Sequence, residues 1–377
     1  MKSFCLSVFL GLCLTALFFS VNCKREDASS INNQPIEIGA TLPLSGDAAV
    51  FGKNSQKGID LALEEINSSG GILGRKVKID YEDTKALAKE GVTAYQKLVS
   101  FNKVTAIIDD SVSSVTLAMA PLADKDHIVV LATGATAPQI SGVSKYVFRI
   151  WNSDAYEGEV IADYAANQAH LTNVAILYIN NEYGKGLERV FRSQFTARHG
   201  KVSGSEAFDQ GSSDLRAQIT KIKATSPEGI YLIAYPKEAA SALRQIKELG
   251  IDSKLLGTVA LNDQQVIDNA GGAAEGLVFP FPKDSTGTQV DAFKKAFEAK
   301  YGTPPPVLGD VGYDALHMIA KAAEISKGIS GQQIQEGLKA LKDYAGASGV
   351  MTFDDKGDVH KPMGIKVIHN GKFEWHE

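Results

Sequence analysis

Short apolar runs alternate with stretches of helical spacing along the chain after Pro35. Residues 36–40 carry apolar side chains at every second position, which is the period of a strand. Residues 59–66 carry them three or four positions apart, as an amphipathic helix does, and Gly70 and Gly71 then favour the end of that helix. The same alternation continues toward the C-terminus, so the pattern predicts a series of strands and helices.

These predicted elements fall into two successive sets. The first set has strands at 36–40, 77–81, 105–108, 127–132 and 146–150, and helices around 59–66, 92–99 and 114–124. The second has helices at 157–168, 186–199, 215–224 and 238–249, and strands at 174–179, 202–208, 229–234, 254–258 and 277–281. Helices at 290–301, 310–326 and 332–341 follow, and then strands at 351–353 and 364–369 around a turn at 354–357. Such alternation indicates two α/β lobes with parallel sheets, and a ligand site in the cleft between the carboxyl ends of their strands.

Residues 1–22 differ from the rest of the chain. They carry one charge, Lys2, before an apolar run that is shorter than the roughly 20 residues of a membrane span but typical of a signal peptide. The run ends before Cys23 and resembles a bacterial lipoprotein signal, in which the cysteine is acylated, although Asn22 replaces the usual small residue. Residues 23–35 are then expected to be a lipidated N-terminus and flexible tether on an exported, periplasmic protein. An ordinary secretory signal, giving a soluble periplasmic protein, or an uncleaved anchor is the alternative.

Composition narrows the functional class. The chain has 377 residues, 39 Lys and Arg against 44 Asp and Glu, and a formal charge of −5, which gives no electrostatic footprint for nucleic acid. Its seven histidines are scattered, and two of its three cysteines, Cys5 and Cys13, lie within the predicted signal. No metal, cofactor or disulfide framework is therefore expected.

Several motifs of catalysis are missing from the sequence. It has no G-x-G-x-x-G after a strand, no P-loop and no G-x-S-x-G nucleophile elbow. Residues 354–358 faintly resemble a calcium loop, but they lack the carboxylate expected at its end, so a hairpin turn is favoured. Nucleotide-driven or esterase chemistry is disfavoured, and the protein is expected not to be an enzyme.

Two loops rich in hydroxyl groups follow neighbouring predicted strands. Residues 111–114 contain three serines at the start of a helix, where free backbone N–H groups favour an anion. Residues 132–136 add two threonines and a glycine after the next strand. Together the loops are candidates to hold one carboxylate, with helix capping by Ser113 or Ser114 as the plainer alternative.

A set of short motifs covers nearly the whole chain in a characteristic order. They lie at 41–46, 66–75, 146–149, 183–186, 243–245, 274–276 and 353–358. Together they resemble the leucine/isoleucine/valine-binding group of the type I periplasmic binding proteins. The resemblance implies two doubly wound α/β lobes joined by a three-stranded hinge.

In such a protein the lobes close over a small solute, which is handed to the permease and ATPase of an ABC importer. The resemblance implies an N-terminal lobe of 36–150 plus 284–348 and a C-terminal lobe of 151–283 plus 349–377. Hinge crossings are then expected near 149–154, 281–285 and 347–351. A ligand sensor of the same fold is one alternative, and an α/β enzyme is another.

The resemblance also implies a set of ligand-binding residues. Ser113 and Thr136 would bind a ligand carboxylate, and backbone groups of Gly134 and Ala135 would hold the rest of the head group. Aromatic side chains would enclose the solute, unless they serve only lobe packing. These are Phe51, Tyr183 and Tyr235.

One position departs from the family pattern. Where amino-acid binders carry an acid that pairs with the ligand ammonium, this chain has Val259. Removal of one partner of a buried charge pair costs about 3–5 kcal/mol. Either Glu182, Asp154 or Asp263 replaces the acid, or the ligand is a carboxylate or amide without an α-amino group. The cysteine pair common in the first lobe is also absent, with Val112 at one of its positions.

Overall fold

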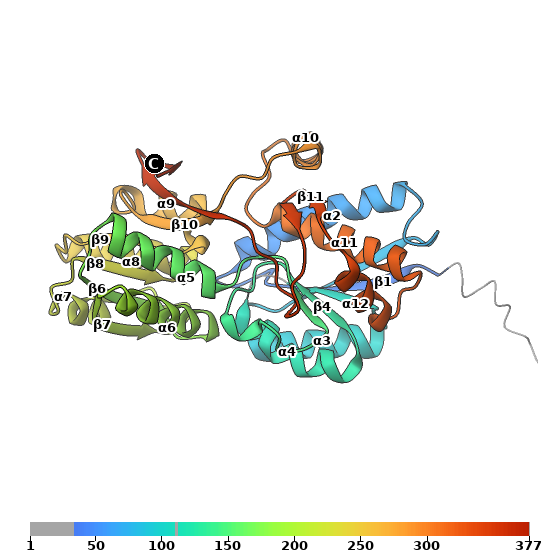
Figure 1. The fold of residues 1–377 in the computed structure, drawn as a ribbon, viewed down its shortest axis with the longest axis horizontal. Coiled ribbons are helices and arrows are strands. Elements are labelled where there is room, and N and C mark those ends of the chain that lie inside the picture. The colour runs from blue at the N-terminus through green and yellow to red at the C-terminus, as the bar shows by residue number, and fades with distance from the viewer. Residues whose placement is uncertain (1–33, 110–111, 377) are drawn as a thin grey trace, which may run out of the picture. The chain divides into compact units, whose positions relative to one another are not determined.

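Two separate β-sheets organise the part of the chain that the computed structural model describes, residues 34–109 and 112–376. Residues Pro35–Glu377 form one compact unit, and both sheets belong to it. Figure 1 shows the two sheets, each with helices packed around it. The predicted signal and Cys23 lie outside the described residues.

The first sheet is parallel throughout and has the order β2-β1-β3-β4-β5. Its strands are β1 (Ile36–Leu42), β2 (Val77–Asp83), β3 (Ala106–Asp109), β4 (Val129–Ala132) and β5 (Val147–Arg149). The strands β3 and β4 are buried along their whole length, as the strands of a parallel sheet covered on both faces are.

Helices cover both faces of this sheet. They are α2 (Ala49–Ser68), α3 (Ala88–Lys97), α4 (Ser113–Asp126), α11 (Gly309–Ser326) and α12 (Gly331–Ala340), with α10 (Thr288–Tyr301) beside α2. In Figure 1, α3 and α4 lie below the sheet, and α2 and α11 lie above it. The three helices predicted after residue 290 therefore return to the first sheet.

Glycines allow α2 and α11 to pack closely. A Cβ atom on Gly58 would lie 1.8 Å from the carbonyl oxygen of Gly309, and one on Gly312 would lie 2.4 Å from that of Ser55. No side chain fits at either distance, so the sequence at these two positions sets the separation of the helices.

The second sheet has the order β14-β13-β10-β9-β8-β6-β7. Its parallel strands are β6 (Asn173–Ile179), β7 (Lys201–Phe208), β8 (Gly229–Ile233), β9 (Lys254–Leu256) and β10 (Val278–Pro282). The strands β13 (Met363–His369) and β14 (Lys372–Trp375) extend it in the antiparallel direction. Its helices are α5 (Asp154–Asp163), α6 (Glu182–Ala197), α7 (Arg216–Lys223), α8 (Pro236–Glu248) and α9 (Gln264–Ala270).

Most boundaries differ from the predicted ones by a few residues, and local capping explains two of the differences. The helix α6 begins at Glu182 instead of 186 because the side chain of Asn181 accepts a hydrogen bond from the Gly184 N–H. The strand β4 begins at Val129 instead of 127 because His127 adopts a left-handed conformation (φ 56°) that ends α4.

Three segments connect the regions of the two sheets. The first lies between β5 and α5, and the second lies between β10 and α10. The third was expected at 347–351, but those residues lie in a hairpin of β11 (Tyr344–Gly346) and β12 (Gly349–Met351). The chain then stays beside the first sheet. There the backbone N–H of Arg149 donates to the carbonyl oxygen of Gly357, and Arg149 and Asp358 form an isolated β-bridge. We therefore place the third crossing at 359–362.

Candidate functional site

A small cavity of about 40 Å³ lies where the loops of the two sheets meet. It is lined by Phe51, Gly134, Thr136, Trp151, Tyr183, Tyr235, Val259, Ala260, Asn262, Val307 and Leu308. Six of the eight residues proposed from the sequence are in this lining. The other two, Ser113 and Ala135, are buried behind it.

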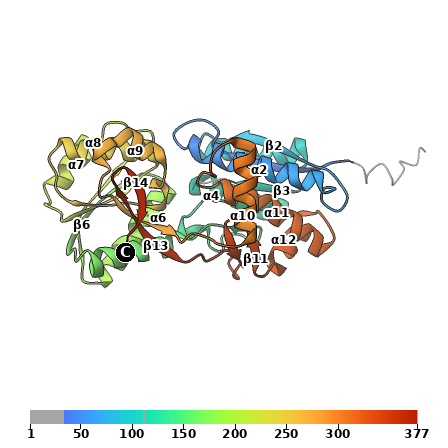
Figure 2. The same ribbon diagram turned by 90° about the horizontal axis from the view of Figure 1, so that it is seen from above.

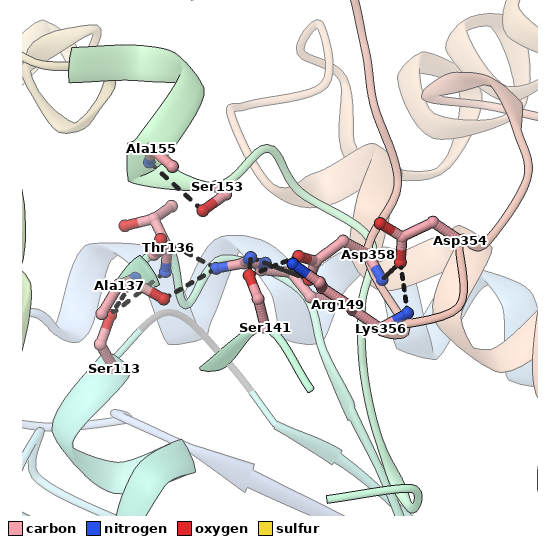
Figure 3. Close-up of polar contacts among 10 residues, drawn as sticks. All are labelled: Ser113, Thr136, Ala137, Ser141, Arg149, Ser153, Ala155, Asp354, Lys356 and Asp358. Atoms are coloured by element: carbon pink, nitrogen blue, oxygen red, sulfur yellow. Dashed lines mark hydrogen bonds and ion pairs between the residues drawn. The ribbon is translucent and has the colours of Figure 1, made fainter. Parts of the chain in front are cut away.

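Ser113 supports the loop that follows β4. Its hydroxyl accepts the backbone N–H groups of Thr136 (3.1 Å) and Ala137 (3.0 Å), as Figure 3 shows. The N-cap of α4 is Val112, so Ser113 does not serve as that cap, which was the plainer alternative for this residue. Ser113 thus joins the start of α4 to the loop after β4, and its expected contact with a ligand carboxylate stays a prediction.

The opposite side of the same loop rests on Arg149 (Figure 3). The fully buried guanidinium donates to the carbonyl oxygens of Thr136 (2.8 Å) and Ala137 (3.0 Å) and pairs with Asp358 at 2.8 Å. Asp354 in turn accepts the N–H of Asp358 at 2.9 Å, so 354–358 is a turn, but not the expected hairpin, because β12 pairs with β11 and β13 pairs with β10 and β14. One arginine therefore joins β5, the loop that carries Thr136 and the start of the third crossing.

Three aromatic rings form one wall of the cavity. Tyr183, in the first turn of α6, stacks on Tyr235 with ring centroids 5.7 Å apart and an angle of 7°. Phe51 of α2 meets the edge of Tyr235 at 6.1 Å. The Tyr183 hydroxyl donates to Thr258 Oγ1 at 2.8 Å, and burial raises the pKa of both tyrosines, so their hydroxyl groups stay neutral.

A pair of buried acids stands directly behind the lining. Asp154 and Glu157 begin α5, and both side chains are essentially inaccessible to solvent. Among the described residues, neither carboxylate oxygen of Asp154 has a hydrogen-bond partner. Glu157 accepts the backbone N–H of Val259 at 3.0 Å. Val259, where the resemblance implied a missing acid, is therefore in contact with an acid from α5.

Burial dominates the protonation of this pair. It raises the pKa of Asp154 to about 7, although Thr136 and the Arg149 guanidinium oppose the change. Burial and the neighbouring Asp154 together raise the pKa of Glu157 well above its ordinary value. Two such groups are poised to ionise when a cation enters beside them.

The three acids that were considered as replacements are placed differently. Asp154 is buried behind the lining, where its backbone N–H donates to the Thr136 carbonyl oxygen at 2.8 Å, whereas Asp263 caps α9 by accepting the N–H of Gln265 at 2.9 Å. Glu182 lies in the first turn of α6 and is not part of the cavity lining. Glu157 was missed, and its signal was an Asp-x-x-Glu spacing at a helix start immediately after a hinge crossing.

The lining also contains residues that no sequence pattern indicated. Trp151 lies on the first crossing, Asn262 follows a short turn after β9, and Leu308 precedes α11. These segments are far apart along the chain, and no local pattern brings them together. Only the packing of the crossings does so.

A comparison with protein families places this geometry in a known context. The model of one family, described as periplasmic binding protein, matches residues 35–371. The chain belongs to that family. Its members bind solutes outside the cytoplasm, and the two-lobed α/β fold expected from the sequence is confirmed.

Individual relatives are moderately similar over almost their full length. The "Leucine-, isoleucine-, valine-, threonine-, and alanine-binding protein" of Pseudomonas aeruginosa is 26% identical, with 97% of this chain and 96% of the relative covered. A "Leu/Ile/Val-binding protein homolog 3" of Brucella melitensis is 28% identical and covers 87% and 89%.

Solved structures agree with these relatives. A leucine binding protein from Thermotoga maritima superposes with a TM-score of 0.86 at 28% identity, covering 91% of this chain and 98% of that protein. A branched-chain amino acid transporter substrate binding protein from Streptococcus pneumoniae, solved with isoleucine, gives 0.82 at 27% identity, covering 90% and 98%.

Proposed function

We propose that this periplasmic binding protein captures a small α-amino acid and delivers it to the permease and ATPase of an ABC importer. The observation that carries the proposal is the buried acid pair of Asp154 and Glu157 beside Thr136 and Val259. A buried carboxylate without a partner is costly, and a ligand ammonium offsets that cost. The ligand is therefore one that keeps its α-amino group, in spite of Val259.

We assign the carboxylate end of the ligand to the loop that follows β4. Gly134 and Thr136 line the cavity there, and the buried Ser113 hydroxyl holds their loop by accepting the N–H groups of Thr136 and Ala137. Phe51, Tyr183 and Tyr235 supply the apolar wall against the ligand. The relatives named for binding leucine, isoleucine, valine, threonine or alanine support this substrate class.

Binding is expected to use hinge closure. Phe51 belongs to the region of the first sheet and Tyr235 to that of the second, and Asp47 and Lys237 form an ion pair across the same boundary at 2.7 Å. A ligand that contacts both sides stabilises the closed arrangement relative to an open one. The permease would then recognise the closed form.

Attachment to the membrane is assigned to the N-terminus. No helix in the described part of the chain has the length and apolar character needed to cross a bilayer. We propose that Cys23 is acylated and that residues 23–35 tether the binding unit to the membrane. Mass spectrometry of the purified protein tests this proposal.

Titration calorimetry with matched ligands tests the binding proposal. The set contains leucine, 4-methylpentanoate (leucine without its ammonium), 3-methylbutylamine (leucine without its carboxylate), valine, threonine, alanine and glutamine. At least one amino acid is expected to bind. At about 100 times its Kd, that amino acid should also add about 2.7 kcal/mol to the free energy of unfolding. The two truncated analogues are expected to bind at least a hundredfold more weakly than leucine if leucine is a ligand. Equal binding of 4-methylpentanoate would contradict the role of the acids, and failure of every amino acid would contradict the substrate class.

A further inference from the structure

A second cavity adjoins the small one on the side of the hinge. It has a volume of about 300 Å³ and shares four lining residues with the first cavity: Trp151, Asn262, Val307 and Leu308. The crossings and residues 304–306 provide much of its remaining wall. We call this space the hinge chamber. Figure 2 shows α10, which borders it, beside β11.

The size of the small cavity indicates that the two spaces belong together. Sites for small molecules usually enclose about 300–1,000 Å³. The cavity among the predicted residues has only about 40 Å³, which is too little for an amino-acid side chain, whereas the hinge chamber next to it reaches this range. Trp151 and Leu308 form part of the partition between them.

Lys361 places a charge at this partition. Its side chain lines the hinge chamber and is only 7% exposed. The backbone around it is fixed, because Lys361 N–H donates to Asn152 Oδ1 at 2.7 Å and Asn152 Nδ2 donates to the Lys361 carbonyl oxygen at 2.8 Å. Its ammonium lies 5.6 Å from the centroid of the Trp151 ring. The charge is therefore held in the wall of the hinge chamber, next to Trp151.

The ammonium of Lys361 has hydrogen-bonding capacity to spare. It donates to Ser348 Oγ at 2.9 Å, and among the described residues this is its only hydrogen bond, although an ammonium has three donors. Asp314 does not pair with it directly, because its two oxygens accept the N–H groups of Ala347 and Ser348 and the Ser348 hydroxyl. A buried donor of this kind fits an acceptor from a ligand.

The charges around Lys361 select the kind of acceptor. Asp310 and Asp314 both interact electrostatically with its ammonium and favour the charged form, while burial lowers the pKa of Lys361. At the rim of the chamber, the two exposed lysines Lys283 and Lys294 are equalled in number by two exposed acids, Asp284 and Glu298. A neutral carbonyl group therefore suits the chamber better than a second carboxylate.

We propose that the ligand site extends past Trp151 and Leu308 into the hinge chamber, and that Lys361 there binds the amide carbonyl of an extended amino-acid side chain. This inference rests on the proposed amino-acid function and names a substrate class for it. Phe281, Pro282 and Val307 provide apolar contacts for the methylene groups of such a side chain. The head group occupies the same place as in the proposed function.

Calorimetry with glutamine and norleucine tests the extension, because both have unbranched side chains but only glutamine ends in an amide. Glutamine is expected to bind about tenfold to a hundredfold more tightly, which is the contribution of a hydrogen bond to a charged group. The variant Lys361→Met is expected to abolish this difference. The control Lys295→Met, exposed on α10 and outside the chamber lining, is expected to preserve it.

A second variant covers the case in which Lys361→Met does not fold. Pro305 is partly exposed and lines the hinge chamber but not the small cavity, so Pro305→Trp should block the chamber, weaken glutamine at least tenfold and leave alanine binding unchanged. Equal binding of glutamine and norleucine, or equal weakening of both in Lys361→Met, would overturn the extension while leaving the proposed function intact. Tighter binding of glutamate than glutamine would overturn the choice of a neutral acceptor. Failure of all amino acids would overturn both proposals.

Discussion

At the scale of single residues, Asp154 is expected to affect both ligand binding and protein stability. Replacing it by asparagine removes the partner of the ligand ammonium, which costs about 3–5 kcal/mol, or two to more than three orders of magnitude in affinity. The same change removes a buried acid without a hydrogen bond, so the ligand-free variant is expected to be at least as stable as the wild type at neutral pH. Calorimetry and urea unfolding of Asp154→Asn measure the two effects.

Glu159→Gln is the matched control for this variant, because Glu159 is exposed on the same helix. It should change neither affinity nor stability appreciably. If Asp154→Asn were strongly destabilising and bound ligand normally, the acid would have a structural role and not a ligand-binding one.

The pH dependence of binding provides a further readout for Asp154. Its pKa in the ligand-free folded state is about 7, above the ordinary 3.8, so the folded protein retains this proton to higher pH than the unfolded chain does. The free energy of unfolding of the ligand-free protein is therefore expected to fall as pH rises from about 4 to 7. A bound ammonium requires the ionised acid, so affinity should rise over the same interval and become constant above it. Asp154→Asn should remove most of the pH dependence of affinity but only part of that of stability, because burial also raises the pKa of Asp109 to about 7 and that of Asp314 to about 6.

At the scale of single elements, the packing of α2 on α11 depends on glycine. Alanine in a helix interior is normally favoured over glycine by about 1 kcal/mol. At Gly58 the added Cβ would meet the Gly309 carbonyl oxygen, so Gly58→Ala is expected to destabilise the protein by about 1–3 kcal/mol instead. Urea unfolding measures the sign. Lys53→Ala, exposed on the same helix, should be close to neutral, and a stabilised Gly58→Ala would show that the helices do not approach this closely.

The elements show what a sequence pattern can and cannot predict. Alternation and helical spacing predicted both sheets because burial of strands and helix faces leaves a periodic signal. Element ends were less accurate because they depend on caps such as Asn181 and on the left-handed turn at His127. The third crossing was misplaced because its position depends on the contact of Arg149 with Asp358, two residues far apart in the sequence.

The site follows the same rule. Residues in loops after strands, such as Thr136 and Tyr235, could be proposed from their place in the alternation and the family resemblance. Glu157 was missed because its Asp-x-x-Glu spacing does not reveal that its side chain accepts the backbone N–H of Val259, a residue far along the chain. Lys361 could not be proposed from the sequence either, because a lysine near a polar turn gives no sign that the fold will bury it.

In the molecule as a whole, interactions between the two sides of the hinge determine how much binding free energy the ligand must supply for closure. Two pairs already made in this structure are Asp47 with Lys237, which is polar and near the surface, and Phe51 with Tyr235, which is aromatic and buried, and α6 also packs against α4. Both lower the free energy of the closed arrangement before a ligand contributes. If either pair is broken, ligand binding must supply the missing free energy, so affinity reports on closure even where the ligand is not touched.

The ion pair of Asp47 and Lys237 allows this coupling to be measured apart from ligand chemistry. The Lys237 side chain is 63% exposed, and exposed pairs contribute about 0.2–1 kcal/mol. Lys237→Met is therefore expected to weaken ligand binding by up to about fivefold, because the pair is made only when the two sides meet. Wild-type affinity should fall as sodium chloride is raised from about 0.01 M to 1 M, since screening weakens the pair. The affinity of Lys237→Met should depend less on salt.

Lys221→Met, which breaks the pair with Glu206 within the second sheet's region, should weaken neither binding nor its salt dependence. Equal salt dependence in wild type and Lys237→Met would mean that this pair does not contribute to closure, and that the aromatic contact and the ligand itself hold the two sides together.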